Sequence, residues 1–155
     1  MISIIIPAYN EGQQIAETIS KIHAAKGQFP VEIIVADGGS TDDTLEIASK
    51  CAITILSEIK GRAAQMNKGA SIARGDILYF LHADSIPPKN FTAYIKDAVD
   101  KGFSSGCFRL SFDHSHWFLK ANSWLTRFNV NAVRFGDQSL YVTKDIFKKS
   151  GGFRE

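Results

Sequence analysis

Apolar runs and amphipathic segments alternate along the first hundred residues of the chain. Short, mostly apolar runs followed by polar or glycine-containing loops are typical of buried strands, and they cover residues 2–6, 31–36, 51–56 and 77–81. Between them, apolar residues recur at helical spacing, as Ile15, Ile19 and Ile22 do. This alternation of strand and helix predicts an α/β fold with a parallel, doubly wound sheet that is covered by helices on both faces.

The pattern changes after residue 102. A glycine- and serine-rich stretch leads into residues 108–112, where we expect a strand that can run antiparallel to the others. Aromatic residues recur at helical spacing over residues 117–128, which fits either a core helix or an amphipathic helix that touches a membrane. Residues 136–142 read as a loop entering a short strand, and residues 143–147 as a capped helical turn.

Length and charge restrict the class of protein. At 155 residues we expect one domain over residues 1–155, and a net charge of +2 is too small to argue for nucleic acid as a partner. No stretch reaches the ~18 apolar residues that span a bilayer, and no leader pattern is evident, so we expect a cytoplasmic protein. Cys51 and Cys107 lie in apolar surroundings and are expected to be buried, without a disulfide or metal role.

The candidate chemistry lies where the predicted strands end. The run over residues 77–81 leads into His82, Ala83 and Asp84, and ligands of open α/β sheets bind outside the carboxyl ends of the strands. His82 and Asp84 are two residues apart, so on an extended chain both side chains point to the same side, where they could hold a divalent cation. The alternative is that Asp84 caps the following turn and His82 packs in the sheet.

The other strand ends carry polar groups as well. Asn10, after the first strand and its terminal Pro7, is a good N-cap for the next helix. Asp37 ends the second strand, where it could bind a nucleoside or serve its own turn. Lys60 and Arg62 could neutralise a diphosphate or form ordinary solvated surface. Neither common glycine-rich phosphate fingerprint is present, which disfavours a Rossmann dehydrogenase or a P-loop NTPase.

Several sequence motifs point together to a known family. Residues 3–11 read Ser-Ile-Ile-Ile-Pro-Ala-Tyr-Asn-Glu, residues 35–42 Val-Ala-Asp-Gly-Gly-Ser-Thr-Asp, residues 61–67 Gly-Arg-Ala-Ala-Gln-Met-Asn, and residues 80–84 Phe-Leu-His-Ala-Asp. In this order they resemble a family 2 glycosyltransferase of the GT-A fold, in the variant that also carries Gly-Asp-Gln. The resemblance implies a Rossmann-like three-layer sandwich with a mainly parallel central sheet. It also implies transfer of a sugar from a nucleotide-diphosphate sugar, typically UDP-linked, to a hydroxyl acceptor with inversion.

The resemblance also implies roles for individual residues. Asp84 matches the last aspartate of the family's metal motif, and His82 replaces the first aspartate, so Asp84 is the secure ligand for Mn²⁺ or Mg²⁺. Asp37 would hydrogen-bond the base, with Asp42 nearby. The residues expected to bind the donor nucleotide are Pro7, Ala8, Asn10, Glu11, Asp37, Ser40, Lys60, Arg62, Asn67 and Ala83. On the acceptor side we expect Gly136, Asp137 and Gln138, with Asp137 helping to orient the acceptor.

One departure from the family pattern concerns the general base. In the family it comes from a Glu-Asp motif shortly after Gly-Gly-Phe, and this sequence ends at residue 155 before such a motif. We therefore expect a chain that lacks its C-terminal part, and the base stays unassigned. A catalytically impaired nucleotide-sugar-binding fragment and a nucleotidyltransferase are the alternatives. Further expectations are a lipid-linked acceptor, peripheral contact with the inner face of the membrane, and self-association.

Overall fold

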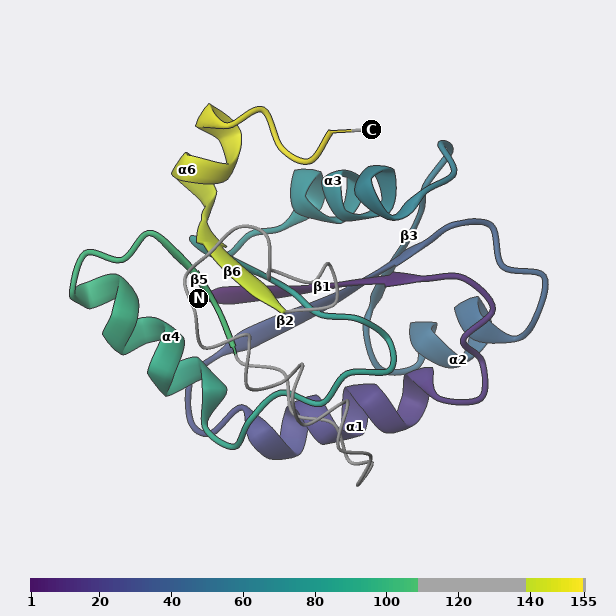
Figure 1. Ribbon diagram of the computed structural model, residues 1–155. Coiled ribbons are helices and arrows are strands. Elements are labelled where there is room, and N and C mark those ends of the chain that lie inside the picture. Colours follow the sequence, from purple (N-terminus) through teal and green to yellow (C-terminus); the bar gives the residue numbers. More distant parts are fainter. Residues whose placement is uncertain (109–138, 155) are drawn as a thin grey trace, which may run out of the picture.

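The computed structural model describes residues 1–108 and 139–154. Helices and strands alternate through most of this length (Figure 1). The elements, in chain order, are β1 (Ile2–Ala8), α1 (Ile15–Ala25), β2 (Val31–Asp37), α2 (Thr44–Ser49), β3 (Ile53–Leu56), α3 (Arg62–Ile72), β4 (Ile77–Phe80), α4 (Phe91–Asp100), β5 (Ser105–Cys107), β6 (Leu140–Thr143) and α6 (Lys144–Lys149).

The strands form one sheet in the order β3-β2-β1-β4-β6-β5. The strands β1 to β4 run parallel to their neighbours among themselves, while β6 is antiparallel to β4 and to β5. The prediction of a mainly parallel α/β sheet is therefore confirmed. The expected short strand near residue 142 and the helical turn after it are confirmed as β6 and α6.

The sheet lies between two layers of helices, with α1, α2 and α4 on one face and α3 and α6 on the other (Figure 1). Neighbouring residues of β1 serve opposite faces, as a strand requires. Ile4 and Ile6 belong to the apolar cluster with α1 and α4, whereas Ile5 packs with Ala70 of α3 in the second cluster. Because both faces are covered, the central strands are mostly apolar, and β4 is an uninterrupted apolar run. This is the expected three-layer sandwich.

Strand β1 passes through Pro7, where the sequence predicted its end. The Ala8 carbonyl accepts from Gly38 beyond β2, and the Ile5 carbonyl accepts from Leu81 beyond β4. The backbone N–H and C=O groups of even-numbered residues of β1 therefore point toward β2, and the backbone groups of odd-numbered residues such as Pro7 point toward β4. The ladder with β4 stops at the Ile5–Phe80 pair, so the missing N–H of Pro7 interrupts no ladder bond.

Two further local predictions were wrong. Asn10 does not cap α1, because it takes a left-handed φ of 57° and the helix starts only at Ile15, with Gln14 at the N-cap. Cys51 and Cys107 are both exposed, not buried. Cys51 lies in the turn before the edge strand β3, and Cys107 ends the other edge strand, β5, so their apolar sequence neighbours do not enclose them.

Other predictions lie outside the described residues. These include the aromatic segment 117–128, most of the strand expected at 108–112, and the acceptor-side residues Gly136, Asp137 and Gln138. Within the described ranges, no helix combines the length and the apolar character that crossing a bilayer requires.

Candidate functional site

The carboxyl ends of β1, β2 and β4 lie side by side at one edge of the sheet. From β1 the chain moves through β2 to β3 on one side, and then returns to place β4 on the other side of β1. The strand order therefore reverses between β1 and β4, and such a switch point leaves a crevice between diverging loops where ligands bind in this class of fold. His82, Ala83 and Asp84 follow β4 at this point.

The loops that follow β1 and β2 are fastened to each other. The backbone N–H of Asn10 donates to Ser40 Oγ at 2.9 Å, and that of Glu11 donates to Thr44 Oγ1 at 2.8 Å. In return, the Asn10 side-chain oxygen accepts from the Thr41 N–H at 2.8 Å. These contacts explain the left-handed Asn10, and they bring three predicted nucleotide-binding residues, Asn10, Glu11 and Ser40, into one rim.

Asp42 strengthens the same rim. One carboxylate oxygen accepts from the Gly12 N–H at 3.0 Å, and the other accepts from the Thr44 N–H at 3.0 Å and from the Thr44 hydroxyl. The Thr44 hydroxyl bond is the main reason that the pKa of Asp42 lies below its ordinary value. The ionised form of Asp42 therefore stabilises the joined loops.

Asp37 is fully buried at the end of β2. Its Oδ2 accepts from the N–H groups of Gly39 and Ser40, each at 2.8 Å, and its Oδ1 accepts from the Ser40 hydroxyl at 2.5 Å. The carboxylate thus organises the turn that carries Ser40 to Asn10. Of the two roles predicted for Asp37, the structure describes the turn role directly.

Sequence reasoning did not single out Gln65, which lies beneath this rim. It is buried on α3, and its Nε2 donates to the Ala8 carbonyl at 2.6 Å and to the Ala36 carbonyl at 3.0 Å. One amide thereby ties together the ends of β1 and β2. A Cβ at Gly38 would lie 2.8 Å from this nitrogen, so the glycine leaves room for the contact. The sequence feature that could have indicated Gln65 is its amide side chain among the small residues of the Gly-Arg-Ala-Ala-Gln-Met-Asn motif.

The segment after β4 presents a carboxylate to solvent. Ala83 is buried, His82 is half-buried and Asp84 is exposed. The Ser85 N–H donates to the His82 carbonyl at 3.1 Å, and the Ser85 hydroxyl lies 3.3 Å from Asp84 Oδ1. Asp84 can therefore reach a ligand from a short, closed turn.

A hard divalent cation fits Asp84 only with help from a ligand. Within residues 1–108 and 139–154, no three His, Cys, Asp or Glu side chains gather closely enough to hold a metal ion by themselves. Mg²⁺ and Mn²⁺ accept one or two carboxylates together with phosphate oxygens and water. The donor set here suits a cation that arrives with a diphosphate.

Three further predicted residues, Lys60, Arg62 and Asn67, lie in helix α3 or in the loop just before it. Lys60 and Arg62 are exposed where the loop after β3 enters α3, and Gly61 between them has a φ of 122°. Asn67 is directed to another part of the chain: its Nδ2 donates to the Phe153 carbonyl and its Oδ1 accepts from the Phe153 N–H, both at 2.9 Å. The structure thus joins α3 to the Gly-Gly-Phe turn.

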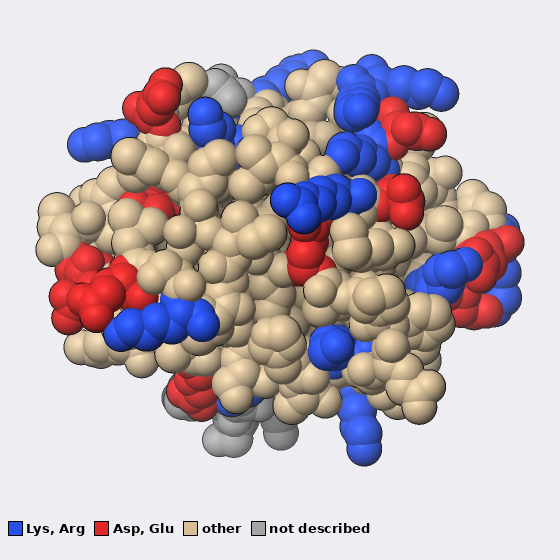
Figure 2. Space-filling view, turned by 180° about the vertical axis from the view of Figure 1, so that it is seen from behind, with Lys and Arg blue, Asp and Glu red and all other residues tan. Residues whose placement is uncertain are grey.

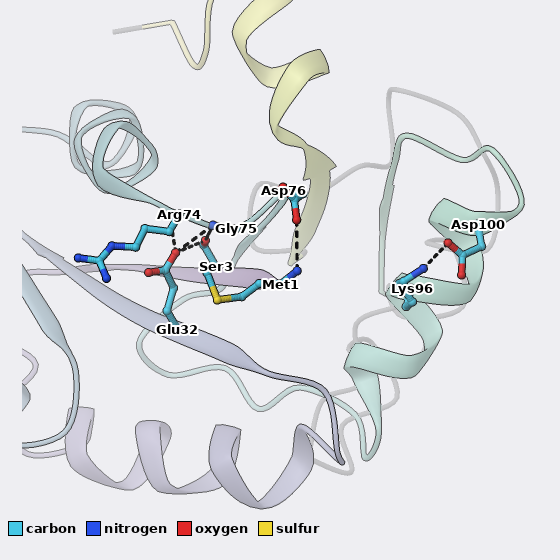
Figure 3. Close-up of polar contacts among 8 residues, drawn as sticks. All are labelled: Met1, Ser3, Glu32, Arg74, Gly75, Asp76, Lys96 and Asp100. Carbon is cyan, nitrogen blue, oxygen red and sulfur yellow. Dashed lines mark hydrogen bonds and ion pairs between the residues drawn. The ribbon is translucent and has the colours of Figure 1, made fainter.

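The opposite edge of the sheet has a hollow of its own, of about 460 Å³. Its lining includes Met1, Asp76, Ile77 and Lys144, at the start of β1, the start of β4 and the end of β6. Figure 3 shows polar contacts at this edge, among them the ion pair between the N-terminal amine and Asp76 at 3.3 Å. The hollow is therefore separated from Asp84 by the length of β4.

Charge is also uneven between the layers. Lys and Arg side chains gather along the top of Figure 2, the side that α3 and α6 cover. Helix α3 contains Arg62 and Lys68 and no acidic residue, and α6 contains three lysines and one aspartate. The layer that borders Lys60 and Arg62 is the more basic one.

Comparisons with known proteins bear on the family and the fold of the chain. The sequence model of glycosyl transferase family 2 matches residues 3–151. The undecaprenyl-phosphate 4-deoxy-4-formamido-L-arabinose transferase of Pseudomonas syringae pv. syringae (strain B728a) is 31% identical over 127 residues, which are 75% of this chain and 38% of that protein. The dolichol-phosphate mannosyltransferase of Pyrococcus furiosus is 30% identical over 107 residues, 65% of this chain and 30% of that protein.

Solved structures share the fold. The mannosyltransferase PcManGT from Pyrobaculum calidifontis, in complex with GDP-Man and Mn²⁺, has a TM-score of 0.74 at 20% identity, over 99% of this chain and 47% of that one. Residues 1–349 of S. aureus TarS in complex with UDP give a TM-score of 0.78 at 20% identity, over 99% of this chain and 50% of that one. The chain spans half or less of the length of each of these four proteins. It has the expected GT-A fold and belongs to glycosyl transferase family 2.

Proposed function

We propose that this chain carries the donor-binding part of a glycosyltransferase. The donor is a nucleotide-diphosphate sugar, UDP-linked, which binds at the carboxyl edge of the sheet. Its sugar passes to a hydroxyl acceptor with inversion. The observation that carries the proposal is the exposed Asp84 carboxylate at the switch point, next to loops that are already joined to each other.

The nucleoside lies against the rim built by the loops after β1 and β2. An ionised carboxylate has about four lone-pair sites. The turn of Asp37 uses three hydrogen bonds to that carboxylate, which leaves about one site, and because the side chain is buried the base reaches it only through a shift of this turn. Because Asn10, Glu11 and Ser40 are held by hydrogen bonds before a ligand arrives, little ordering entropy is lost on binding.

The diphosphate lies between the turn of Asp84 and the start of α3. Asp84 would hold the divalent cation, with His82 as a second contact, and the exposed Lys60 and Arg62 would neutralise the phosphates. When bound, Mn²⁺ or Mg²⁺ offsets the negative charge that develops on the leaving diphosphate. The mannosyltransferase PcManGT, which shares the fold and was solved with both GDP-Man and Mn²⁺, supports the use of a divalent metal in this family.

The acceptor side is proposed to include Gly136, Asp137 and Gln138, and a lipid-linked acceptor is favoured by the names of two relatives. The basic layer of α3 and α6 would attract an anionic membrane surface or a lipid phosphate. A binding module that does not turn over is the second candidate, because we assign no general base among the described residues. Membership of the family favours sugar transfer over nucleotidyl transfer.

Calorimetry with UDP and GDP, with and without Mn²⁺, tests the proposal. We expect UDP to bind more tightly with Mn²⁺, Asp84→Ala to remove the metal effect, and Asp37→Ala to weaken binding under both conditions. If neither nucleotide binds to the folded wild-type chain, the proposed donor site is wrong. Release of UDP from UDP-sugars, with and without an acceptor, then separates an enzyme from a binding module.

A further inference from the structure

We propose that Thr18 is a positioning residue for Asp84, acting through the backbone of Ala83. Its hydroxyl, on α1, donates to the Ala83 carbonyl at 2.5 Å. The inference rests on the proposed function, since it assumes that Asp84 holds the cation. It adds a residue that lies 65 positions away in the sequence and that is in none of the motifs.

The contact is buried on both sides. Thr18 is 5% exposed and Ala83 is 4% exposed. Thr18 shares the inward face of α1 with Ile15, Ile19 and Ile22, all of them in the apolar core. A hydroxyl in such surroundings is costly unless it is hydrogen-bonded, so the bond to Ala83 also accounts for a polar residue on this face.

The bond holds the chain just after the strand ladder ends. The last backbone bond between this strand and β1 is from the Leu81 N–H to the Ile5 carbonyl, at 3.0 Å. Ala83 is two residues further on, and its carbonyl is held by a side chain from the helix layer instead. Ala83 lies between the two predicted metal ligands, so fixing this peptide fixes the direction in which Asp84 leaves the sheet.

Asp84 itself is exposed, and the Ser85 hydroxyl lies 3.3 Å from it, at the long end of hydrogen-bond range. Its orientation therefore depends on the backbone of the turn more than on side-chain neighbours. Groups that orient metal ligands typically change metal affinity by about 10- to 100-fold when they are lost. Since Thr18 acts one peptide away, we expect the lower end of that range.

The test compares Thr18→Val, which removes the hydroxyl and keeps the shape, with Thr18→Ser, which keeps the hydroxyl. Thr92→Val is the matched control, because Thr92 is also a buried threonine whose hydroxyl donates to a backbone carbonyl, that of Lys26. With UDP present, Thr18→Val should weaken Mn²⁺ binding by about tenfold, whereas Thr18→Ser and Thr92→Val should stay near wild type. If Thr18 has a purely structural role, both valine variants should have a lower melting temperature and the same Mn²⁺ affinity as each other.

A second readout needs no metal. In the chain alone, Thr18→Val should speed hydrogen exchange at the Ser85 amide, which closes the turn, and Thr92→Val should not. If Thr18→Val does not fold, Thr18→Ala replaces it in both measurements. Unchanged Mn²⁺ affinity and unchanged Ser85 exchange in the folded variant would overturn the positioning role, even where UDP and Mn²⁺ bind the wild type as proposed. If the wild type binds no nucleotide, the proposed function fails, and the exchange of Ser85 still decides whether Thr18 fixes the turn.

Discussion

Gln65→Leu should destabilise the fold through the two strand ends that the amide now joins. The variant removes the bonds to the Ala8 and Ala36 carbonyls. Each net hydrogen bond contributes about 0.5–1.5 kcal/mol, so we expect a loss of about 2 kcal/mol in the free energy of unfolding. The Ala8 carbonyl still accepts from the Gly38 N–H at 2.9 Å, which keeps the cost from rising further. For a chain of this size, 2 kcal/mol corresponds to roughly 4–8 °C in Tm.

Gln65→Glu sharpens the same prediction by adding a pH dependence. A carboxylate buried beside two carbonyls has its pKa raised above the ordinary value of about 4.3. The folded state then binds a proton that the unfolded state releases, so the variant is most stable below about pH 4 and loses stability as the pH rises through the raised pKa. At pH 7, Gln65→Glu should therefore be less stable than Gln65→Leu, and at about pH 4.5 the difference in stability between the two variants should be smaller.

Urea unfolding of the three proteins at the two pH values gives the comparison. Ser71→Ala is the control on the same helix, since the Ser71 hydroxyl bonds only locally to the Lys68 carbonyl in the described contacts. Equal stability of wild type and Gln65→Leu, or a Gln65→Glu variant that does not respond to pH, would refute the bridging role of this amide.

Three further predictions concern single contacts. Asp37→Ala leaves three donors of its own turn unpaired and should lower the free energy of unfolding in urea by about 3 kcal/mol. Asp37→Asn can still accept from backbone N–H groups and should lower it by about 1 kcal/mol. Equal losses in the two variants would contradict the turn role. Asn67→Ala should raise the hydrogen-exchange rate of the Phe153 amide about tenfold, which corresponds to a loss of roughly 1.4 kcal/mol of local stability. An unchanged rate would show that the two hydrogen bonds between Asn67 and Phe153 are not formed in solution. Because the pKa of Asp42 is depressed, the stability that its ionised carboxylate contributes to the fold is present above the ordinary value of 3.8 and is lost as the pH falls through the lowered pKa. Acid unfolding of Asp42→Asn should therefore be less steep than that of wild type. Identical curves would argue against a stabilising role of the ionised carboxylate.

The fold was predictable because its elements have recognisable local patterns. A sheet covered on both faces produces apolar runs such as residues 77–81, and helices that cover one face produce the spacing of Ile15, Ile19 and Ile22. The site could be approached from the same rule, since ligands collect at the carboxyl ends of parallel strands. That rule predicts Asp37 and Asp84 as residues of the proposed site.

Contacts across the fold could not be predicted, because they depend on pairs that are far apart in the sequence. Gln65 reaches Ala8, Thr18 reaches Ala83, and Asn67 reaches Phe153, over separations of 57, 65 and 86 residues. Asn10 was misjudged for the same reason: its side chain is used by the neighbouring loop, so local capping preference did not decide its conformation. Local sequence patterns report on faces and ends of elements, not on which distant group satisfies a buried carbonyl.

The central claim, that a metal-bound nucleotide lies at the carboxyl edge beside Asp84, is tested most directly by paramagnetic broadening. Amide signals of the ¹⁵N-labelled chain would be recorded with UDP and a diamagnetic cation, Mg²⁺, and then with UDP and Mn²⁺. We expect the amides of residues 9–12, 38–41 and 82–85 to broaden strongly with Mn²⁺, those of residues 2–3, 75–77 and 143–145 to broaden far less, and Asp84→Ala to abolish this difference. Broadening centred on the hollow at the opposite edge, or a pattern that survives Asp84→Ala, would contradict it.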